Sequence, residues 1–217
     1  MRSVNTSRIQ AWTRPLIAVA AIAMTLASAT RAEDSDGNPH MQLSSRTFKD
    51  NGTLPDRMAN NFPNKAGVNT CTLDGKAGGD ESPQLSWSNA PPETRTFAVV
   101  MYDEIAGFTH WGVYDIPGDV HDLPANVAPD STIGIQVYND DFTLGYFGPC
   151  PPDGVAPTRH RYTITVYALA DRLDVVNLAN FPAFGESMYQ ALIKASRRGQ
   201  ILQSASITGF ATTTPTK

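Results

Sequence analysis

The amino-acid sequence predicts one β-rich domain with a single helix close to its C-terminal end. Segments of strand length, rich in apolar and β-branched residues, recur through the second half of the 217-residue chain. Sixteen glycines and sixteen prolines interrupt the chain too often for long helices to dominate. Apolar residues make up 41% of the chain and charged residues 18%, a globular composition that excludes a disordered protein.

Five segments are expected to be strands, after a region (residues 41–80) in which scattered apolar residues among Asn, Gly and Pro predict only short strands and loops. The clearest segment is the fourth, in which Tyr162, Ile164 and Val166 alternate with polar residues, as in a half-buried strand. The expected strands are residues 96–103, 111–116, 133–138, 160–169 and 201–210.

One helix is expected at residues 187–198, between the last two strands. Met188 and Leu192 stand four residues apart, so they fall on the same side and give the helix an apolar face. Gly199 suits the left-handed position that ends a helix, and the basic Arg197 suits its last turn.

The first 32 residues have the three-part pattern of a secretory signal peptide. A basic stretch without acidic residues comes first, an apolar run at 16–26 follows, and small residues then allow cleavage after Ala29 or Ala32. The run is shorter than the ~20 residues that a permanent membrane-spanning helix needs, and an uncleaved membrane anchor is the alternative. We therefore expect a periplasmic or secreted protein with no transmembrane segment after cleavage, organised as a signal peptide (1–32), a flexible leader (33–40) and one domain (41–217).

Export bears on charge and on the two cysteines. Removal of the signal peptide takes away four arginines and no carboxylate, so the net charge changes from −4 to −8, which argues against a nucleic-acid-binding protein. In an oxidising compartment Cys71 and Cys150 have only one possible pairing, which would close a large loop. Two separate thiols are the alternative. No CxxC motif or zinc-ligand spacing occurs, so redox catalysis is not expected.

Polar side chains stand at the ends of the expected strands. Asp103 shares a face with the apolar residues of its strand, and the short connection to His110 favours an antiparallel neighbour, which would put both residues at one end of the sheet. His160 and Tyr162 share a face at the start of a later strand. If these ends coincide, the four side chains form a polar mouth on an apolar pocket, the usual form of a small-molecule site.

The loop at residues 145–152 (Gly-Tyr-Phe-Gly-Pro-Cys-Pro-Pro) is restricted by three prolines. Its glycines, Gly148 among them, allow backbone N–H groups to turn together toward an oxyanion; a structural turn pinned by a disulfide is the alternative. Alternatives also stand for the side chains. A strand-end histidine is often structural, Asp103 could make an Asx turn, and Tyr162 could be a core tyrosine.

Five motifs follow one another within residues 41–210: Asp80-Glu-Ser-Pro-Gln-Leu-Ser-Trp87, Met101-Tyr-Asp103, His110-Trp111, Gly145-Tyr-Phe-Gly-Pro-Cys-Pro-Pro152 and His160-Arg-Tyr162. In this order they resemble the phosphatidylethanolamine-binding protein family, in particular its bacterial Raf-kinase-inhibitor-like branch. The resemblance implies a mainly β fold in which a large central antiparallel-rich sheet packs on a smaller sheet, with a helix in the C-terminal region. It also implies a site for a small anion or phosphorylated head group, made by Asp103, His110, Tyr146, Gly148, His160 and Tyr162, with the turn at residues 80–83 as a neighbour.

The chain departs from that family after the first strong strand. Members commonly have Asp-Pro-Asp-Ala where this chain has Asp103-Glu104-Ile105-Ala106, so the second carboxylate is replaced and the rim of the pocket is expected to differ.

The expected function is an exported binding protein for phosphate or phosphoethanolamine, without a cofactor, a metal or catalytic activity. One alternative is a protein-binding regulator or inhibitor of kinases or proteases, for which a protein partner would be needed. A more distant alternative is a metal-dependent or acid–base hydrolase that uses Asp103, His110 and His160. The sequence lacks the Gly-x-Ser-x-Gly, His-Glu-x-x-His and P-loop motifs, which counts against an enzyme.

Overall fold

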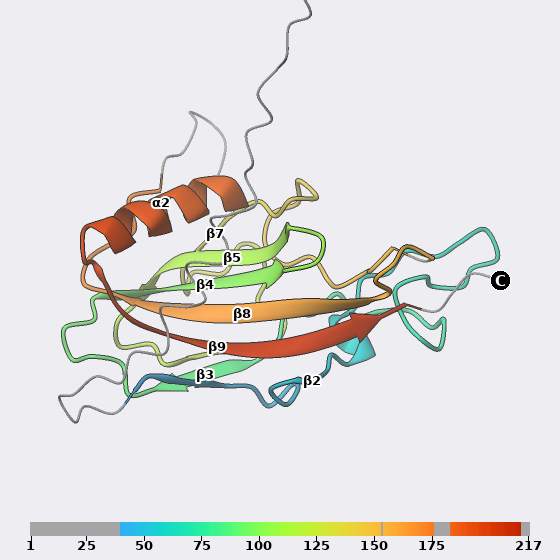
Figure 1. The fold of residues 1–217 in the computed structure, drawn as a ribbon, viewed down its shortest axis with the longest axis horizontal. Helices are drawn as coiled ribbons and strands as arrows, with labels where there is room; N and C mark the ends of the chain where they lie inside the picture. Colours follow the sequence, from blue (N-terminus) through green and yellow to red (C-terminus); the bar gives the residue numbers. More distant parts are fainter. Residues whose placement is uncertain (1–39, 153, 176–182, 214–217) are drawn as a thin grey trace, which may run out of the picture. The chain divides into compact units, whose positions relative to one another are not determined.

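The computed structural model describes residues 40–152, 154–175 and 183–213. The predicted signal peptide (1–32) and leader residues 33–39 lie outside these described residues. Within them the fold is mainly β, with two sheets and an α-helix near the C-terminal end, as the sequence predicts (Figure 1).

The larger sheet has six strands in the order β2-β9-β8-β4-β5-β7. Four of the five pairings between neighbouring strands in this sheet are antiparallel, and the short β2 runs parallel to its neighbour β9. The strands are β2 (Gly52–Thr53), β4 (Thr96–Asp103), β5 (Phe108–Pro117), β7 (Ile135–Gln136), β8 (Arg159–Leu169) and β9 (Ile201–Thr212).

The smaller sheet and the helix cover the two faces of the larger sheet. In Figure 1, α2 (Gly185–Arg197) lies along one face and β3 lies on the other side. The smaller sheet has the order β1-β3-β6, and a short 3-10 helix lies between β2 and β3 in the sequence. Their bounds are β1 (Gln42–Ser44), β3 (Leu85–Ser88), β6 (Asp122–Leu123) and η3 (Asp56–Met58).

Strand β4 is apolar at nearly every position because both of its faces are buried. Successive side chains of a strand point to opposite faces. Phe97 and Met101 pack in a cluster with Trp87 of the smaller sheet, whereas Val100 packs in a second cluster with Met188 of α2. This burial on both sides explains the continuous apolar run that predicted the strand.

The predicted elements agree with the structure to within three residues at each end. The strand expected at residues 133–138 is limited to β7, because Tyr138 beyond it makes isolated bridges to Leu144 and Phe184 instead of continuing along β5. Helix α2 begins two residues earlier than predicted, and Gly199 after it has φ of +66°, the left-handed conformation expected there.

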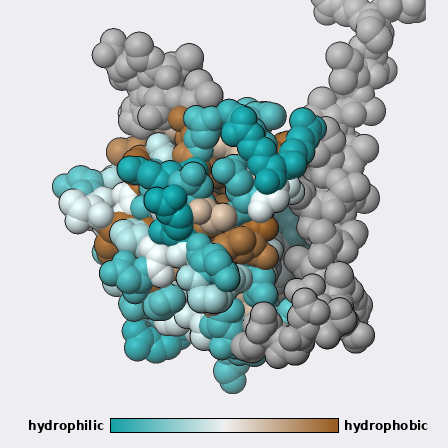
Figure 2. Space-filling view, turned by 90° about the vertical axis from the view of Figure 1, so that its left-hand side faces the viewer, coloured by the Kyte–Doolittle hydropathy of each residue, from teal (hydrophilic) through white to brown (hydrophobic). Residues whose placement is uncertain are grey.

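The end of the large sheet at which β4 and β9 begin is shown in Figure 2. Hydrophilic side chains predominate on this end, with smaller apolar areas interspersed. The polar residues singled out by the sequence lie at the other end of the same strands, where β4 ends and β8 begins.

Candidate functional site

Three adjacent strands bring the predicted polar residues together. β4 and β5 are antiparallel and joined by a tight turn, with Asp103 opposite Phe108. On the other side of β4, Asp103 is directly opposite Tyr162 of β8. His110, two residues into β5 from Phe108, and His160, two residues before Tyr162, therefore belong to the same end of the sheet, as the sequence predicts.

His110 is the extra residue of a β-bulge. Trp111 is opposite Met101 and Thr109 is opposite Tyr102, so the residue between them has no partner on β4. A bulge re-aims a side chain at the edge of a ladder. The His110 ring lies edge-on to the ring of Tyr162, with centroids 5.1 Å apart.

Asp103 has two roles in this site. Its Oδ1 accepts hydrogen bonds from the backbone N–H groups of Ile105 (2.8 Å) and Ala106 (3.0 Å), which close the turn after β4. Its Oδ2 lies 2.6 Å from Nδ1 of His160. The carboxylate therefore closes a local turn and also fixes the orientation of an imidazole.

His110 is held in one tautomer by a backbone carbonyl. Its Nδ1 lies 2.7 Å from the carbonyl oxygen of Phe147, and because a carbonyl only accepts, Nδ1 carries the hydrogen. Burial lowers the pKa of His110 to about 4, and this outweighs the opposing effects of the Phe147 carbonyl and the Asp103 carboxylate. In the neutral ring Nε2 then has a lone pair and no hydrogen.

The hydroxyl of Tyr162 is the unsatisfied group of the site. It is buried and has no hydrogen bond of ordinary geometry within the described part of the chain, although Asp103 lies opposite on the next strand. Burial, followed by the charge of Asp103 and a hydrogen-bonding contact with that carboxylate, raises the pKa of Tyr162, so the hydroxyl keeps its proton. A buried polar group without a partner is costly, and a bound ligand would satisfy it.

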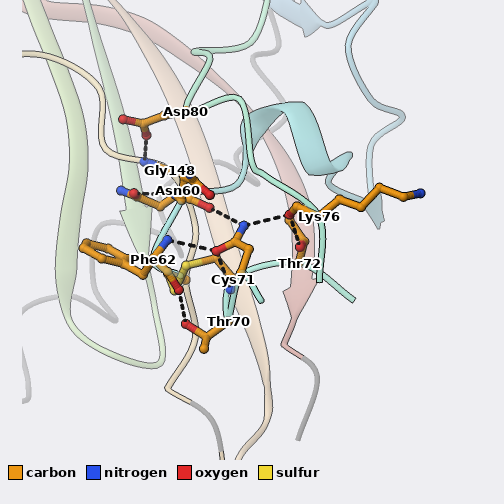
Figure 3. The surroundings of a disulfide bond; sticks show 11 residues. Asn60, Phe62, Thr70, Cys71, Thr72, Lys76, Asp80 and Gly148 are labelled. Atoms are coloured by element: carbon orange, nitrogen blue, oxygen red, sulfur yellow. Dashed lines mark hydrogen bonds between the residues drawn. A yellow bond between two sulfur atoms is a disulfide. The ribbon is translucent and has the colours of Figure 1, made fainter. Parts of the chain in front are cut away.

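Gly148 is present, but its N–H is already used. It donates to Oδ1 of Asp80 at 2.6 Å, as Figure 3 shows. Asp80 reaches it from a left-handed backbone conformation with φ of +50°. A side chain at Gly148 would not fit, because a Cβ would lie 2.4 Å from the carbonyl oxygen of Met58. The N–H expected to face an anion therefore faces an internal carboxylate.

Tyr146 is also engaged with the protein. Its buried hydroxyl donates to the carbonyl oxygen of Met58 at 3.0 Å, and its ring packs edge-on against Trp111. Its hydroxyl therefore anchors the loop at residues 145–152 to the segment near η3.

A disulfide between Cys71 and Cys150 fixes this loop, in agreement with the predicted pairing (Figure 3). The Asn60 N–H donates to the carbonyl of Pro149 at 3.1 Å, next to the disulfide. The Asn69 amide donates to the carbonyls of Asn60 (3.0 Å) and Lys76 (3.1 Å), so the two segments that flank Cys71 are tied together. The disulfide and these bonds make the loop rigid enough to position the Phe147 carbonyl.

Aromatic side chains cover the site. Phe108 lies 4.7 Å from His110 between ring centroids, and Phe147 lies 5.7 Å from Phe108. Phe62, which is 48% exposed, packs on the outer side of Phe147 at 5.9 Å. The four candidate side chains beneath this aromatic cover are almost fully buried, with exposed fractions of 2% for Asp103, 4% for His110, 5% for His160 and 1% for Tyr162.

A separate cavity of about 100 Å³ borders the disulfide. None of the four candidate side chains lines it; its lining includes Leu54, Cys71, Pro149, Arg159 and Phe210. In the described ranges, no three or more His, Cys, Asp or Glu side chains are grouped so that they could hold a metal ion. No helix among the described elements is long and apolar enough to cross a membrane.

Two features of the site were not found from the sequence. The bulge at His110 leaves no local pattern, and the aromatic cover combines Phe62 with residues far along the chain. The loop that contains Phe147 and Gly148 was recognised in the sequence as part of the candidate site. The hydrogen bond of the Phe147 carbonyl to His110 could not be recognised there, because a backbone group leaves no mark in the sequence.

Comparison with known proteins gives one consistent result. The family model described as phosphatidylethanolamine-binding protein matches residues 44–212. A UPF0098 protein of Aquifex aeolicus is 35% identical over 181 residues, covering 81% of this chain and 91% of the relative. A UPF0098 protein of Methanothermobacter thermautotrophicus is 38% identical over 143 residues, covering 62% of this chain and 80% of the relative.

Solved structures agree with this result. The crystal structure of Escherichia coli YbcL, described as a new member of the mammalian family, superposes with a TM-score of 0.59 at 28% identity, over 82% of this chain and all of that chain. A putative phosphatidylethanolamine-binding protein homolog from Chlamydia trachomatis superposes with a TM-score of 0.57 at 25% identity, over 79% of this chain and 96% of that chain. The sequence match and the two-sheet fold lead to one conclusion: the chain belongs to the phosphatidylethanolamine-binding protein family.

Proposed function

We propose that the chain binds a small oxyanion, such as phosphate or the phosphorylated head group of phosphoethanolamine, at His110, His160 and Tyr162, with Asp103 as a positioning residue. The observation that carries this proposal is the Tyr162 hydroxyl, which is buried beside two imidazoles and makes no hydrogen bond of ordinary geometry with the described residues. An oxygen of the ligand would accept a hydrogen bond from this hydroxyl.

The other groups act around that contact. Asp103 does not bind the anion, because its two oxygens already accept hydrogen bonds from the turn and from His160. It orients His160, as the Phe147 carbonyl orients His110. The aromatic cover of Phe62, Phe108 and Phe147 excludes water, which strengthens polar contacts inside the site. Entry of a ligand requires this cover to move aside.

We propose a binding role without catalysis, in a protein exported through its first 32 residues. The basic, apolar and small-residue pattern of residues 1–32 supports export. The Cys71–Cys150 disulfide supports an oxidising compartment. Expression of the full chain in a bacterium that exports proteins should give a periplasmic form whose mass corresponds to cleavage after Ala29 or Ala32, and an uncleaved cytoplasmic form would contradict export.

Isothermal titration of the purified protein with phosphate and with phosphoethanolamine tests the binding role. Tyr162→Phe should weaken both by roughly 5- to 150-fold, since it removes a hydrogen bond to a charged group worth about 1–3 kcal/mol. Tyr167→Phe removes a hydroxyl from the opposite face of the same strand and is the matched control, expected to bind as wild type. No saturable binding to wild type would overturn the proposal and favour the protein-binding alternative.

A further inference from the structure

We infer that the site selects oxyanions that still carry a proton, such as the monoanion of a phosphomonoester, over fully deprotonated tetrahedral anions such as sulfate. This inference rests on the proposed function and specifies its ligand class. It follows from the hydrogen-bond donors that the described residues leave available at the site.

Three donors that would suit an anion are already used. The Nδ1 hydrogen of His110 is directed at the Phe147 carbonyl at 2.7 Å. Nδ1 of His160 is engaged with the Asp103 carboxylate at 2.6 Å. The Gly148 N–H is directed at the Asp80 carboxylate at 2.6 Å. A deprotonated anion would have to break one of these bonds to gain any of these three donors.

One donor and one acceptor remain on two side chains whose rings pack against each other. The Tyr162 hydroxyl makes no hydrogen bond of ordinary geometry within the described ranges, and its ring lies 5.1 Å from the ring of His110. The Nε2 of neutral His110 is an acceptor. In a ligand with both a P–O⁻ oxygen and a P–OH group, the oxygen accepts a hydrogen bond from the Tyr162 hydroxyl and the P–OH group donates one to Nε2 of His110. Sulfate has no hydrogen to donate, so one of its oxygens would face the Nε2 lone pair.

The charges around His110 also favour a ligand that still carries a proton. Asp103 on β4 raises the pKa of His110 and His160 on β8 lowers it; burial acts in the same direction as His160 and outweighs Asp103, so the ring is neutral at pH 6–8. Tyr162 on β8 keeps its proton, because burial and Asp103 raise its pKa. Asp80 adds a second carboxylate beside the loop at Gly148, where burial raises its pKa. Two carboxylates repel a dianion more than a monoanion.

The experiment compares methyl phosphate with sulfate by isothermal titration from pH 6 to pH 8. The second pKa of a phosphomonoester is about 6, so the affinity for methyl phosphate should fall about 50-fold over this range as the monoanion disappears. Sulfate carries no proton at these pH values and should bind at least tenfold more weakly at pH 6. At pH 8, titrations in buffers of different ionisation enthalpy should show uptake of about one proton per bound methyl phosphate.

Sulfate also controls for titration of the protein. The charge of sulfate is constant over this pH range, so protonation of His160 would change the affinities for both ligands. The ratio of the affinity for methyl phosphate to that for sulfate therefore reports the effect of the proton on the ligand alone. In His110→Gln the acceptor is replaced by an amide that also donates, so the preference for methyl phosphate over sulfate should shrink. Circular dichroism of this variant shows whether it folds, and the wild-type series decides the matter if it does not.

The outcomes separate the two claims. Equal binding of sulfate and methyl phosphate, without dependence on pH, would overturn the inference and leave the oxyanion site in place. Uptake of a proton together with sulfate would place the proton on the protein and would also overturn it. Absence of binding by either ligand at any pH would overturn the proposed function, and the inference with it.

Discussion

Replacement of both bridged cysteines, in the variant Cys71→Ala/Cys150→Ala, should lower the free energy of unfolding by about 4.5 kcal/mol. The disulfide joins positions separated by 79 residues, and the chain-entropy model gives roughly 4.5 kcal/mol for a loop of that length at 25 °C. The reason is that the bond restricts the unfolded chain far more than it restricts the folded one. For a domain of this size, such a change lowers the melting temperature by about 9–18 °C.

Urea unfolding followed by tryptophan fluorescence measures this change, since Trp87 and Trp111 are both buried in the folded protein. The oxidised wild type, the wild type in dithiothreitol and the double variant should be compared. The reduced wild type should approach the stability of the double variant, and the double variant itself should not respond to dithiothreitol.

A loss of less than about 1 kcal/mol in the double variant would refute this reasoning. It would mean that the unfolded chain is already compact enough to keep these segments close, so that the cross-link restricts little.

Three further predictions concern the site and its supports. Burial lowers the pKa of His110 from 6.5 to about 4, so its contribution to stability is complete above pH 6.5 and is lost as the pH falls toward 4. Between pH 7 and pH 4 the free energy of unfolding in urea should therefore fall by about 3 kcal/mol more for wild type than for His110→Gln, and parallel curves of stability against pH would contradict this. Gly148→Ala should cost about 1–3 kcal/mol in thermal unfolding, because the new Cβ would lie 2.4 Å from the Met58 carbonyl oxygen; an unchanged melting temperature would show that the backbone yields freely. Asp103→Asn keeps an acceptor for the turn but loses the charged acceptor at His160, so it should cost about 1–3 kcal/mol, whereas Asp119→Asn at an exposed position should cost nothing measurable.

The sequence predicted the long periodic elements of the fold but not the short ones. β4, β8, β9 and α2 each carry their own pattern of apolar residues, so local reasoning found them. The strands β1, β3 and β6 have two to four residues and were expected only as unspecified short strands or not at all. Strands this short depend on partners distant in sequence, such as Leu43 opposite Trp87.

The same contrast holds within the site. Strand parity and an antiparallel neighbour were enough to place Asp103 and His110 at one end of the sheet. The pairing of β4 with β8, which the sequence left open, brings His160 and Tyr162 to the same end. The partner of the Gly148 N–H is a carboxylate 68 residues away, which no local pattern reveals. A backbone N–H or carbonyl is present at almost every position, so its role is decided by where the loop is placed in space.

The way in which Asp103 holds its turn has a consequence for how the pocket can diversify during evolution. The carboxylate binds the backbone N–H groups of residues 105 and 106, and any residue except proline supplies such a group. Ile105 is 47% exposed, so its side chain is free to change while the hydrogen bond that orients His160 is retained. Mutations at residue 105 can therefore accumulate, and the ligand preference that we propose for this site can change, while Asp103 and His160 keep their arrangement.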